Sequence, residues 1–205
     1  MMYKFRMFVD FDKEENWLEQ MARNGYHLKS TAFGYRFESG SPEDATIKID
    51  YRTFKRKTDF VDYCAMFEDS GWKHLAGTKN SGHQYFQRKH EAAGEDIFSD
   101  DESKASRYKR FADVSLKFAM SFVPLLFIFY VTDAIDFTAF INPKALYYTP
   151  GLWDRTGMDF LFSFLFETPF ALMRGFIWLV MPITIILYIF FWYKSKKLYE
   201  EKKIE

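Results

Sequence analysis

The sequence changes in character near residue 110, where a charged, aromatic half gives way to a half with two long apolar segments. The second segment carries no charged residue from Gly175 to Tyr193. A helix rises about 1.5 Å per residue, so this stretch nearly matches a hydrocarbon core of roughly 30 Å. Because a buried helix of a soluble protein rarely stays apolar on every face, we expect a transmembrane helix over residues 169–193.

The first apolar segment is also long enough to cross a membrane, but it begins with charged residues. Asp113 and Lys117 lie four residues apart in its opening turns, where they can pair and extend toward the interface. We expect a transmembrane helix over residues 111–131 with a polar entrance. Pro124 and Pro182 lie inside the two spans and predict kinks, because each removes a backbone hydrogen bond.

The distribution of Lys and Arg predicts the orientation of both spans. Basic residues precede the first span and follow the second, whereas residues 132–174 contain three basic and five acidic residues, Asp133 among them. Since basic residues concentrate on the cytoplasmic side, we expect a multi-pass protein of the cell membrane with both termini in the cytoplasm. The outer segment would cover residues 132–168 and a basic tail residues 194–205. The residues expected at the membrane surface are Arg107, Lys109, Arg110, Lys194, Lys196 and Lys197.

The first 90 residues are expected to stay in the cytoplasm. Met1 to Asp12 is a short alternating run without the long apolar stretch of a cleavable signal. The single cysteine, Cys64, leaves no intramolecular disulfide and fits a reducing compartment. Fifteen basic against thirteen acidic residues give no charge signature of nucleic-acid binding, so we expect no direct contact with nucleic acid.

The pattern of these 90 residues predicts one βαββ unit built twice. Period-two alternation indicates strands, and helical spacing of apolar residues between turn signals indicates helices. In the first unit we expect a strand over 3–11 around Phe5, Met7 and Val9, a helix from 12–15 to Asn24-Gly25, and strands over 28–33 and 35–38. In the second unit we expect a strand over 47–51, a helix over 58–70, and strands over 72–76 and 84–88.

Landmark residues correspond between the two units. Trp17 and Tyr63 occupy equivalent places in the two helices, and Gly25 and Gly71 end them, because glycine accepts a left-handed conformation. The fold class is therefore α+β, with a ferredoxin-like duplication followed by two transmembrane helices. We expect the two helices of the duplication to cover one antiparallel or mixed sheet.

Cap signals place the helix ends near the spans. Residues 91–110 form a polar connector, in which Ser99 to Glu102 has the form of a capping box and predicts a helix that runs into the first span. Thr168-Pro169 has the residues of a helix N-cap and first turn, so the second span is expected to begin there. Phe160 to Phe166 is too short to cross a membrane, and we expect an interfacial or re-entrant element.

The sequence contains no phosphate-binding loop, dinucleotide fingerprint, paired-cysteine metal site or zincin helix. We therefore expect no enzyme activity, no cofactor and no metal. Cys64 lies within the second helix and is interpreted as a packed, inert thiol. The acidic residues at the start of the first helix, which suit either the helix dipole or a cation, are Asp10, Asp12, Glu14 and Glu15.

Four aromatic residues are the candidates for a ligand-binding wall in the soluble half. Duplicated βαββ units elsewhere bind small hydrophobic ligands in the groove between repeats, which is an analogy of fold alone. The candidates are Trp17, Tyr26, Tyr63 and Trp72, and the alternative is that the same rings form the plain hydrophobic core.

Several motifs resemble a known bacterial family. They are Phe-Val-Asp-Phe-Asp-Lys-Glu-Glu-Asn-Trp-Leu (8–18), Met-Ala-Arg-Asn-Gly-Tyr-His-Leu (21–28), Gly-Trp (71–72) and Phe-Ser-Asp-Asp-Glu-Ser-Lys-Ala-Ser-Arg-Tyr-Lys-Arg (98–110). The chain resembles the family catalogued as domain of unknown function 2812. The resemblance implies two-pass membrane proteins encoded near PadR-type transcription regulators, and it carries no catalytic residue over to this sequence.

These observations favour a membrane-tethered sensory or regulatory module whose cytoplasmic domain binds a partner protein or a small ligand. The expected partners are the lipid bilayer and a protein, either a second copy of the chain or a transporter. An accessory subunit of a membrane transporter is the alternative function, and an enzyme that acts on lipids is a third.

Overall fold

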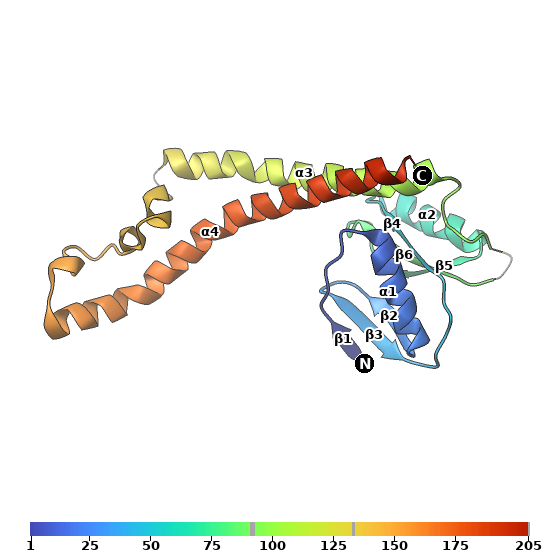
Figure 1. Ribbon diagram of the computed structural model, residues 1–205, viewed down its shortest axis with the longest axis horizontal. Coiled ribbons are helices and arrows are strands. Elements are labelled where there is room, and N and C mark those ends of the chain that lie inside the picture. Colours follow the sequence, from blue (N-terminus) through green and yellow to red (C-terminus); the bar gives the residue numbers. More distant parts are fainter. Residues whose placement is uncertain (91–92, 133, 205) are drawn as a thin grey trace. The chain divides into compact units, whose positions relative to one another are not determined.

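The computed structural model describes residues 1–90, 93–132 and 134–204. Residues 91, 92, 133 and 205, which fall in the expected connector, outer segment and tail, lie outside the described part of the chain. The chain divides into two units (Figure 1). Unit 1 consists of Met1–Val114 with Phe191–Glu205, and unit 2 consists of Ser115–Phe190.

The first βαββ unit forms a three-stranded antiparallel sheet with one helix. Its elements are β1 (Met2–Lys4), α1 (Phe11–Arg23), β2 (Tyr26–Ser30) and β3 (Tyr35–Ser39), and the strand order is β1-β3-β2. The carboxylate of Asp10 accepts a hydrogen bond from the backbone N–H of Lys13 at 3.4 Å and so caps α1. Asp12 and Glu14 lie in the first turn, where negative charge complements the helix dipole.

The second unit repeats this arrangement. Its elements are β4 (Ile47–Tyr51), α2 (Lys57–Asp69), β5 (Trp72–Ala76) and β6 (His83–Arg88), and the strand order is β4-β6-β5. The bounds of α2 and β5 follow those of α1 and β2 by 46 residues throughout. Gly25 and Gly71 follow the two helices with φ angles of 78° and 84°. The α+β class and the two βαββ units are confirmed.

A shared irregularity strengthens the correspondence between the units. The pairing of β2 with β3 shifts register between Leu28 and Ser30, and that of β5 with β6 shifts between His74 and Ala76. These positions are again 46 residues apart. A bulge at the same place in both units is a feature of the repeat itself and not an isolated irregularity of one strand.

The expectation of one continuous sheet is wrong, because each unit has its own three-stranded sheet. β2 and β5 lie next to each other, yet no ladder joins them. The outer edge of β4 is closed by α1: the N–H groups of Ile47 and Ile49 donate to the carboxylates of Glu19 and Glu15 at 3.1 and 3.0 Å. No further strand can pair at an edge whose donors are already used.

The expected first strand over residues 3–11 is also wrong in extent. β1 ends at Lys4, which pairs with Tyr35, the first residue of β3, so the residues after Lys4 have no strand opposite them. Phe5 and Met7 are consequently 83% and 63% exposed, although their alternation predicts a half-buried strand.

The described residues of unit 1 form two hydrophobic cores. The first lies between α1 and both sheets, and its most buried members are Phe11, Leu18, Phe37, Ile49 and Tyr108. The second lies between α2 and the other face of the second sheet and is formed by Tyr63, Trp72 and Phe86. The second sheet is therefore covered on both faces.

Two long helices follow the duplication. They are α3 (Asp101–Val131) and α4 (Gly157–Lys202), and both are long and apolar enough to cross a membrane. The cap of α3 lies one residue beyond the expected box: the carboxylate of Asp100 accepts from the N–H of Ser103 at 2.6 Å. Only 11% of the most apolar window of either helix is buried.

The start of α4 differs from the expectation. Since α4 begins at Gly157, Thr168-Pro169 does not begin the helix, and Phe160–Phe166 is part of it rather than a re-entrant element. The hydroxyl of Thr168 donates to the carbonyl of Phe164 at 2.6 Å inside the helix.

The segment between α3 and α4 is folded within unit 2. Its described residues include the short 3-10 helices η1 (Phe137–Phe140), η2 (Pro143–Leu146) and η3 (Leu152–Asp154). Ile135 and Ala139 pack with Trp178 of α4 in a small third core. The carboxylate of Glu167 accepts from the N–H of Tyr148 at 3.2 Å and the hydroxyl of Thr149 at 2.8 Å, and it pairs with Arg174.

Phe37→Ala should lower the free energy of unfolding by about 3–5 kcal/mol, because it removes a ring from a fully buried site. Phe33→Ala is the matched control, since that ring is 85% exposed. A urea titration of the full chain in mild detergent, followed by circular dichroism, measures both. Equal losses in the two variants would contradict the position of the first core.

Candidate functional site

The segment Arg107–Phe111 of α3, called here the α3 anchor, packs against the rest of unit 1 through every residue except the exposed Lys109. The side chain of Arg107 is fully buried. Its guanidinium donates to the carboxylates of Glu15 and Asp12 and, at 2.7 Å, to the carbonyl oxygen of Ile49. A single side chain of α3 therefore joins α1 to β4.

Two lysines also contact the carboxylates around Arg107. Lys48 lies 3.6 Å from the Glu15 carboxylate, and Lys202, at the end of α4, lies 3.2 Å from that of Asp12. Burial raises the pKa of Glu15, while the charges of Arg107 and Lys48 act against that rise. Elements from both ends of the chain thus meet at one buried cluster of charges, in which every ion has a partner.

Arg110, one helical turn later, makes the second polar contact of the α3 anchor. It donates to the carboxylate of Asp50 and, at 2.6 Å, to the carbonyl oxygen of Tyr51. The hydroxyl of Tyr63 on α2 donates to the same Asp50 carboxylate at 2.7 Å. Burial and the charge of Asp50 raise the pKa of Tyr63, which keeps this hydroxyl a donor. The contact links α3 through β4 to α2.

The outward edge of β4 is therefore satisfied by two helices. Its free N–H groups at Ile47 and Ile49 bond to carboxylates of α1, and its free carbonyl groups at Ile49 and Tyr51 bond to arginines of α3. Successive residues of a strand direct their polar groups to opposite sides, so only alternate residues of β4 take part.

Aromatic rings complete the α3 anchor. Tyr108 lies 4.8 Å from Phe11, and Phe111 lies 5.1 Å from Tyr51 and 6.1 Å from Phe191 of α4, all between ring centroids. The hydroxyl of Tyr108 contacts the Asp10 carboxylate at 3.3 Å. Such pairs add to the stabilisation that burial provides.

Glu14 joins the two sheets. It is almost fully buried, and one of its carboxylate oxygens accepts from the hydroxyls of Tyr35 on β3 and Tyr85 on β6 at 2.6 and 2.7 Å. Burial, reinforced by the charge of Glu14, raises the pKa of both tyrosines, which therefore stay protonated. The acidic start of α1 thus has internal partners in addition to the helix dipole.

The four aromatic candidates for a ligand wall are not brought together. Trp17 and Tyr26 are half-buried against the first core, and Trp17 meets Tyr35 at 4.7 Å. Tyr63 and Trp72 are buried members of the second core. Each ring therefore serves a core, as in the alternative interpretation of these residues.

A groove does lie between the repeats, but its lining is polar. It has a volume of about 470 Å³ and runs along β2 and β5. Four of its residues already pair with one another: Lys29 with Glu38 at 2.8 Å, and Gln87 with Glu43 at 2.8 Å. Aromatic walls for an apolar ligand are absent from this lining.

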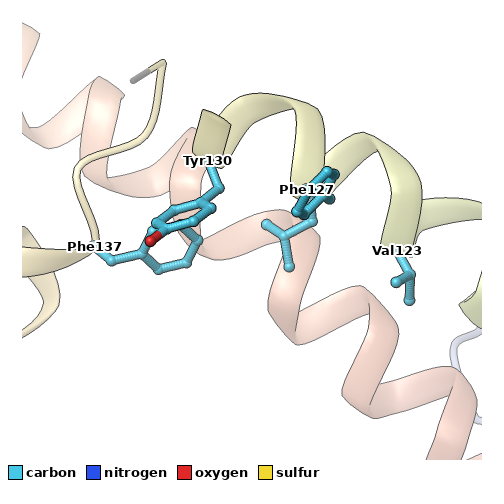
Figure 2. A pocket seen from close by; sticks show the side chains of 5 residues that line it. Val123, Phe127, Tyr130 and Phe137 are labelled. Atoms are coloured by element: carbon cyan, nitrogen blue, oxygen red, sulfur yellow. The ribbon is translucent and has the colours of Figure 1, made fainter. Parts of the chain in front are cut away.

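A hollow of about 370 Å³ on unit 2 is apolar instead, and Val123, Leu126, Phe127, Tyr130 and Phe137 line it. Figure 2 shows the rings of Tyr130 and Phe137 side by side at its end. They meet edge to face, with a centroid distance of 5.6 Å. Ligand sites usually combine apolar walls with a few polar groups that fix orientation. The hollow offers almost only apolar surface, which suits lipid chains better than a specific polar ligand.

The residues expected at the membrane surface separate into two groups. For Arg107 the expectation is wrong, because its guanidinium is buried inside unit 1 with Glu15 and Asp12. Arg110 is paired with Asp50, but its side chain is still 31% exposed. Lys109 on the opposite side of α3 is exposed and lies 5.9 Å from the ring of Tyr199.

Lysines near the end of α4 form the second group. Lys196 and Lys197 are exposed and pair with Glu200 and Glu201 at 3.9 and 3.6 Å, and Lys194 is also exposed. Cys64 on α2 is half-buried, and burial raises the pKa of its thiol, in keeping with an inert side chain.

Sequence reasoning missed the partners of the α3 anchor. Two signals point to them: arginines three residues apart share a helix face, and the start of α1 carries more carboxylates than a helix dipole requires. A rule that assigns every basic residue beside a span to lipid does not separate buried from exposed ones.

Arg107→Ala should lower the free energy of unfolding by about 3–5 kcal/mol, because it leaves the buried Glu15 carboxylate without its main partner. The control is Lys109→Ala, an exposed neighbour on the same helix, for which a change within about 0.5 kcal/mol is expected. Urea titration in mild detergent compares the two. An Arg107→Ala loss no larger than that of the control would show that the charge cluster does not hold unit 1 together.

Comparison with known proteins gives one match. Residues 10–120 match the family described as "Protein of unknown function (DUF2812)". No curated protein and no solved structure matches the chain. The matched residues include the α3 anchor and all of its partners on α1, β4 and α2. Since the match covers more than half of the sequence, the chain belongs to the DUF2812 family.

Proposed function

We propose that this chain is a two-pass membrane protein whose unit 1 acts as a regulatory module in the cytoplasm, binding a partner protein or small ligand according to the state of the membrane. One observation carries the proposal. α3 runs without a break from Asp101 in unit 1 to Val131 in unit 2, and its first turns are bonded to α1 and β4.

Exposed apolar side chains support the membrane location. Phe127 on α3 and Phe176 and Ile186 on α4 are 63%, 69% and 66% exposed. Exposing apolar surface to water costs about 25 cal/mol per Å², so a whole helix of such side chains favours a lipid environment. The basic residues that flank the two spans favour cytoplasmic termini.

Continuity of α3 supports coupling rather than simple tethering. A flexible linker would let unit 1 move independently of the spans, but α3 is helical through the boundary between the units. A tilt or shift of α3 therefore moves Arg107 and Arg110, which hold the edge of β4. Two arrangements of this edge would give unit 1 two binding states.

The alternative, a transporter accessory subunit, would need small residues displayed to a foreign helix. The spans contain few small residues, among them Ala119, Ser121, Gly175 and Thr184, and two of these are used within unit 2. Ala119 is buried, and Gly175 lies so close to η2 that an added Cβ would be 3.1 Å from a methyl group of Leu146. This observation favours the regulatory module.

Topology can be tested with single cysteines in a Cys64→Ala background. Ser41→Cys lies in an exposed loop of unit 1 and Asp154→Cys at an exposed position between α3 and α4. On intact cells an impermeant thiol reagent should modify only the second variant, and both should react after lysis. Modification of Ser41→Cys on intact cells would overturn the proposed orientation.

Coupling can be tested by amide hydrogen exchange of the full chain in bilayers of short-chain or long-chain phosphatidylcholine. Hydrophobic mismatch tilts or shifts a spanning helix, so exchange in β4 and α1 should differ between the two bilayers. A variant with Gly-Ser-Gly inserted between Val114 and Ser115 is the control and should lose the difference. If β4 of the unmodified chain exchanges equally in both bilayers, the spans serve only as an anchor, and regulation by the membrane is refuted.

A further inference from the structure

A second hollow of unit 2 adjoins the apolar hollow that lies along α3, and its lining has a different chemistry. It has a volume of about 500 Å³ and is called here the polar hollow. The rings of Tyr130 and Phe137, at one end of the apolar hollow in Figure 2, line both hollows and so join them. The other described residues that line the polar hollow are Ile135, Asp136, Thr138 and Tyr148.

Asp136 supplies the charge of the polar hollow. Its Oδ1 atom accepts from the hydroxyl and the backbone N–H of Thr138 at 2.6 and 2.8 Å, which fixes the carboxylate at the start of η1. The bond from the hydroxyl and then that from the N–H hold the pKa of Asp136 below its usual range, so the carboxylate is ionised at neutral pH. Its Oδ2 atom takes no part in these bonds, and no Lys or Arg of the described residues forms an ion pair with Asp136. The polar hollow therefore has a negative charge that no described cation neutralises.

Aromatic rings form the other walls of the polar hollow. Tyr130 and Phe137 meet at an interplanar angle of 67°, so they form adjoining walls instead of a flat stack. The ring of Tyr148 already has a cation beside it, since the guanidinium carbon of Arg174 lies 4.0 Å from the ring centroid. Glu167 pairs with Arg174 and offsets that positive charge. The polar hollow thus combines a net negative charge with aromatic rings.

A carboxylate beside aromatic rings favours an organic ammonium ion as the ligand. The negative faces of aromatic rings attract cations, and quaternary ammonium groups are recognised in this way. An anion would be repelled both by the carboxylate of Asp136 and by the ring faces. A metal ion would need several oxygen, nitrogen or sulfur ligands, and the described residues offer no group of three His, Cys, Asp or Glu side chains.

The apolar hollow indicates what the ammonium group is attached to. Val123 and Tyr130 lie toward its two ends (Figure 2) and are seven residues apart on α3, so the hollow follows about 10 Å of the helix. An alkyl chain placed there would bury apolar surface. A free amine, or the Lys side chain of a partner protein, would fill the polar hollow alone. An amphiphile with an ammonium head group would fill both.

We propose that the two hollows of unit 2 together bind an amphiphile with an ammonium head group, the head beside Asp136, Tyr130 and Phe137 and the alkyl chain along α3. Two sources supply this chemistry: phospholipids whose head group carries an ammonium ion, and free cationic amphiphiles. The site goes beyond the regulatory role proposed for unit 1. It concerns unit 2 by itself and can be tested without a bilayer, so its failure is distinct from a failure of the regulatory proposal.

The test uses the full chain in dodecyl maltoside, a neutral detergent, and a probe amphiphile with a trimethylammonium head and a photoreactive diazirine in its alkyl chain. After illumination, mass spectrometry should find the label on α3 between Val123 and Tyr130. Probes with the same chain and a sulfate or a neutral head group should label this stretch about fivefold less, the effect of losing one cation–π contact. Equal labelling by the three probes, or a label confined to other segments, would overturn the proposal.

Two variants test the contacts of the head group. Asp136→Asn removes the charge and keeps the shape of the side chain, so it should lower labelling by the ammonium probe about fivefold and raise labelling by the sulfate probe. Tyr130→Leu keeps an apolar wall without a ring face and should also lower labelling by the ammonium probe about fivefold. The neutral probe should label both variants as it labels the unmodified chain, which shows that the hollows are intact.

Asp154→Asn is the matched control, because Asp154 is an exposed acidic residue between α3 and α4 that lines neither hollow. Labelling by the ammonium probe should not change in this variant. Full labelling of Asp136→Asn and Tyr130→Leu, or an equal loss in Asp154→Asn, would overturn the proposal. Should Asp136→Asn fail to fold, Tyr130→Leu decides, since Tyr130 makes no bond in the cap of η1.

A comparison of two bilayers distinguishes the two sources of the ligand. The full chain is placed in nanodiscs with a constant share of phosphatidylglycerol, the remainder being phosphatidylethanolamine or a neutral glycolipid. Phosphatidylethanolamine carries an ammonium ion and the glycolipid does not, while the net charge of the discs stays the same. Weaker labelling by the ammonium probe in the discs with phosphatidylethanolamine would support a phospholipid as the occupant. Equal labelling in both discs, with the loss in Asp136→Asn retained, would support a free cationic amphiphile.

Discussion

The guanidinium of Arg107 is buried among two carboxylates of α1 and a carbonyl oxygen of β4. Taking a charge out of water costs several kcal/mol, so this arrangement is stable only when every partner is in place. α1 must sit on the edge of β4, and α3 must enter beside it, before the charge is satisfied. One side chain outside both repeats therefore helps to fix their relative positions, together with Glu14 and the shared core.

This requirement explains why a duplicated sequence gives an unequal pair. α1 packs on its own sheet and also closes the edge of β4, whereas α2 packs on the outer face of the second sheet alone. Glu15 and Glu19 have acceptor roles toward β4, and their counterparts 46 residues later, Val61 and Ala65, cannot accept hydrogen bonds through their side chains. The repeat is similar in local structure and different in its contacts.

Local structure was largely predictable. β4 and β5 begin and end at the predicted residues, because glycine stops and alternation define them within a few positions. The predictions that were wrong concern residues whose structure depends on contacts with distant parts of the sequence. Phe5 and Met7 alternate as strand residues do, but β3 begins too late to pair with them. The burial of Arg107 depends on carboxylates more than 90 residues earlier in the sequence. α4 starts earlier than predicted because Pro169 lies inside the helix and does not begin it.

The ion pair between Asp12 and Lys202 also has a consequence for biosynthesis. A ribosome completes residues 1–114 long before it reaches α4, yet Phe191–Glu205 belongs to the same unit. Both apolar helices are made between these two moments. Until α4 is made, Asp12 of α1 lacks its ion pair with Lys202, and the last turns of α4 supply it. The fold of unit 1 is thus completed only by residues that are made after both apolar helices.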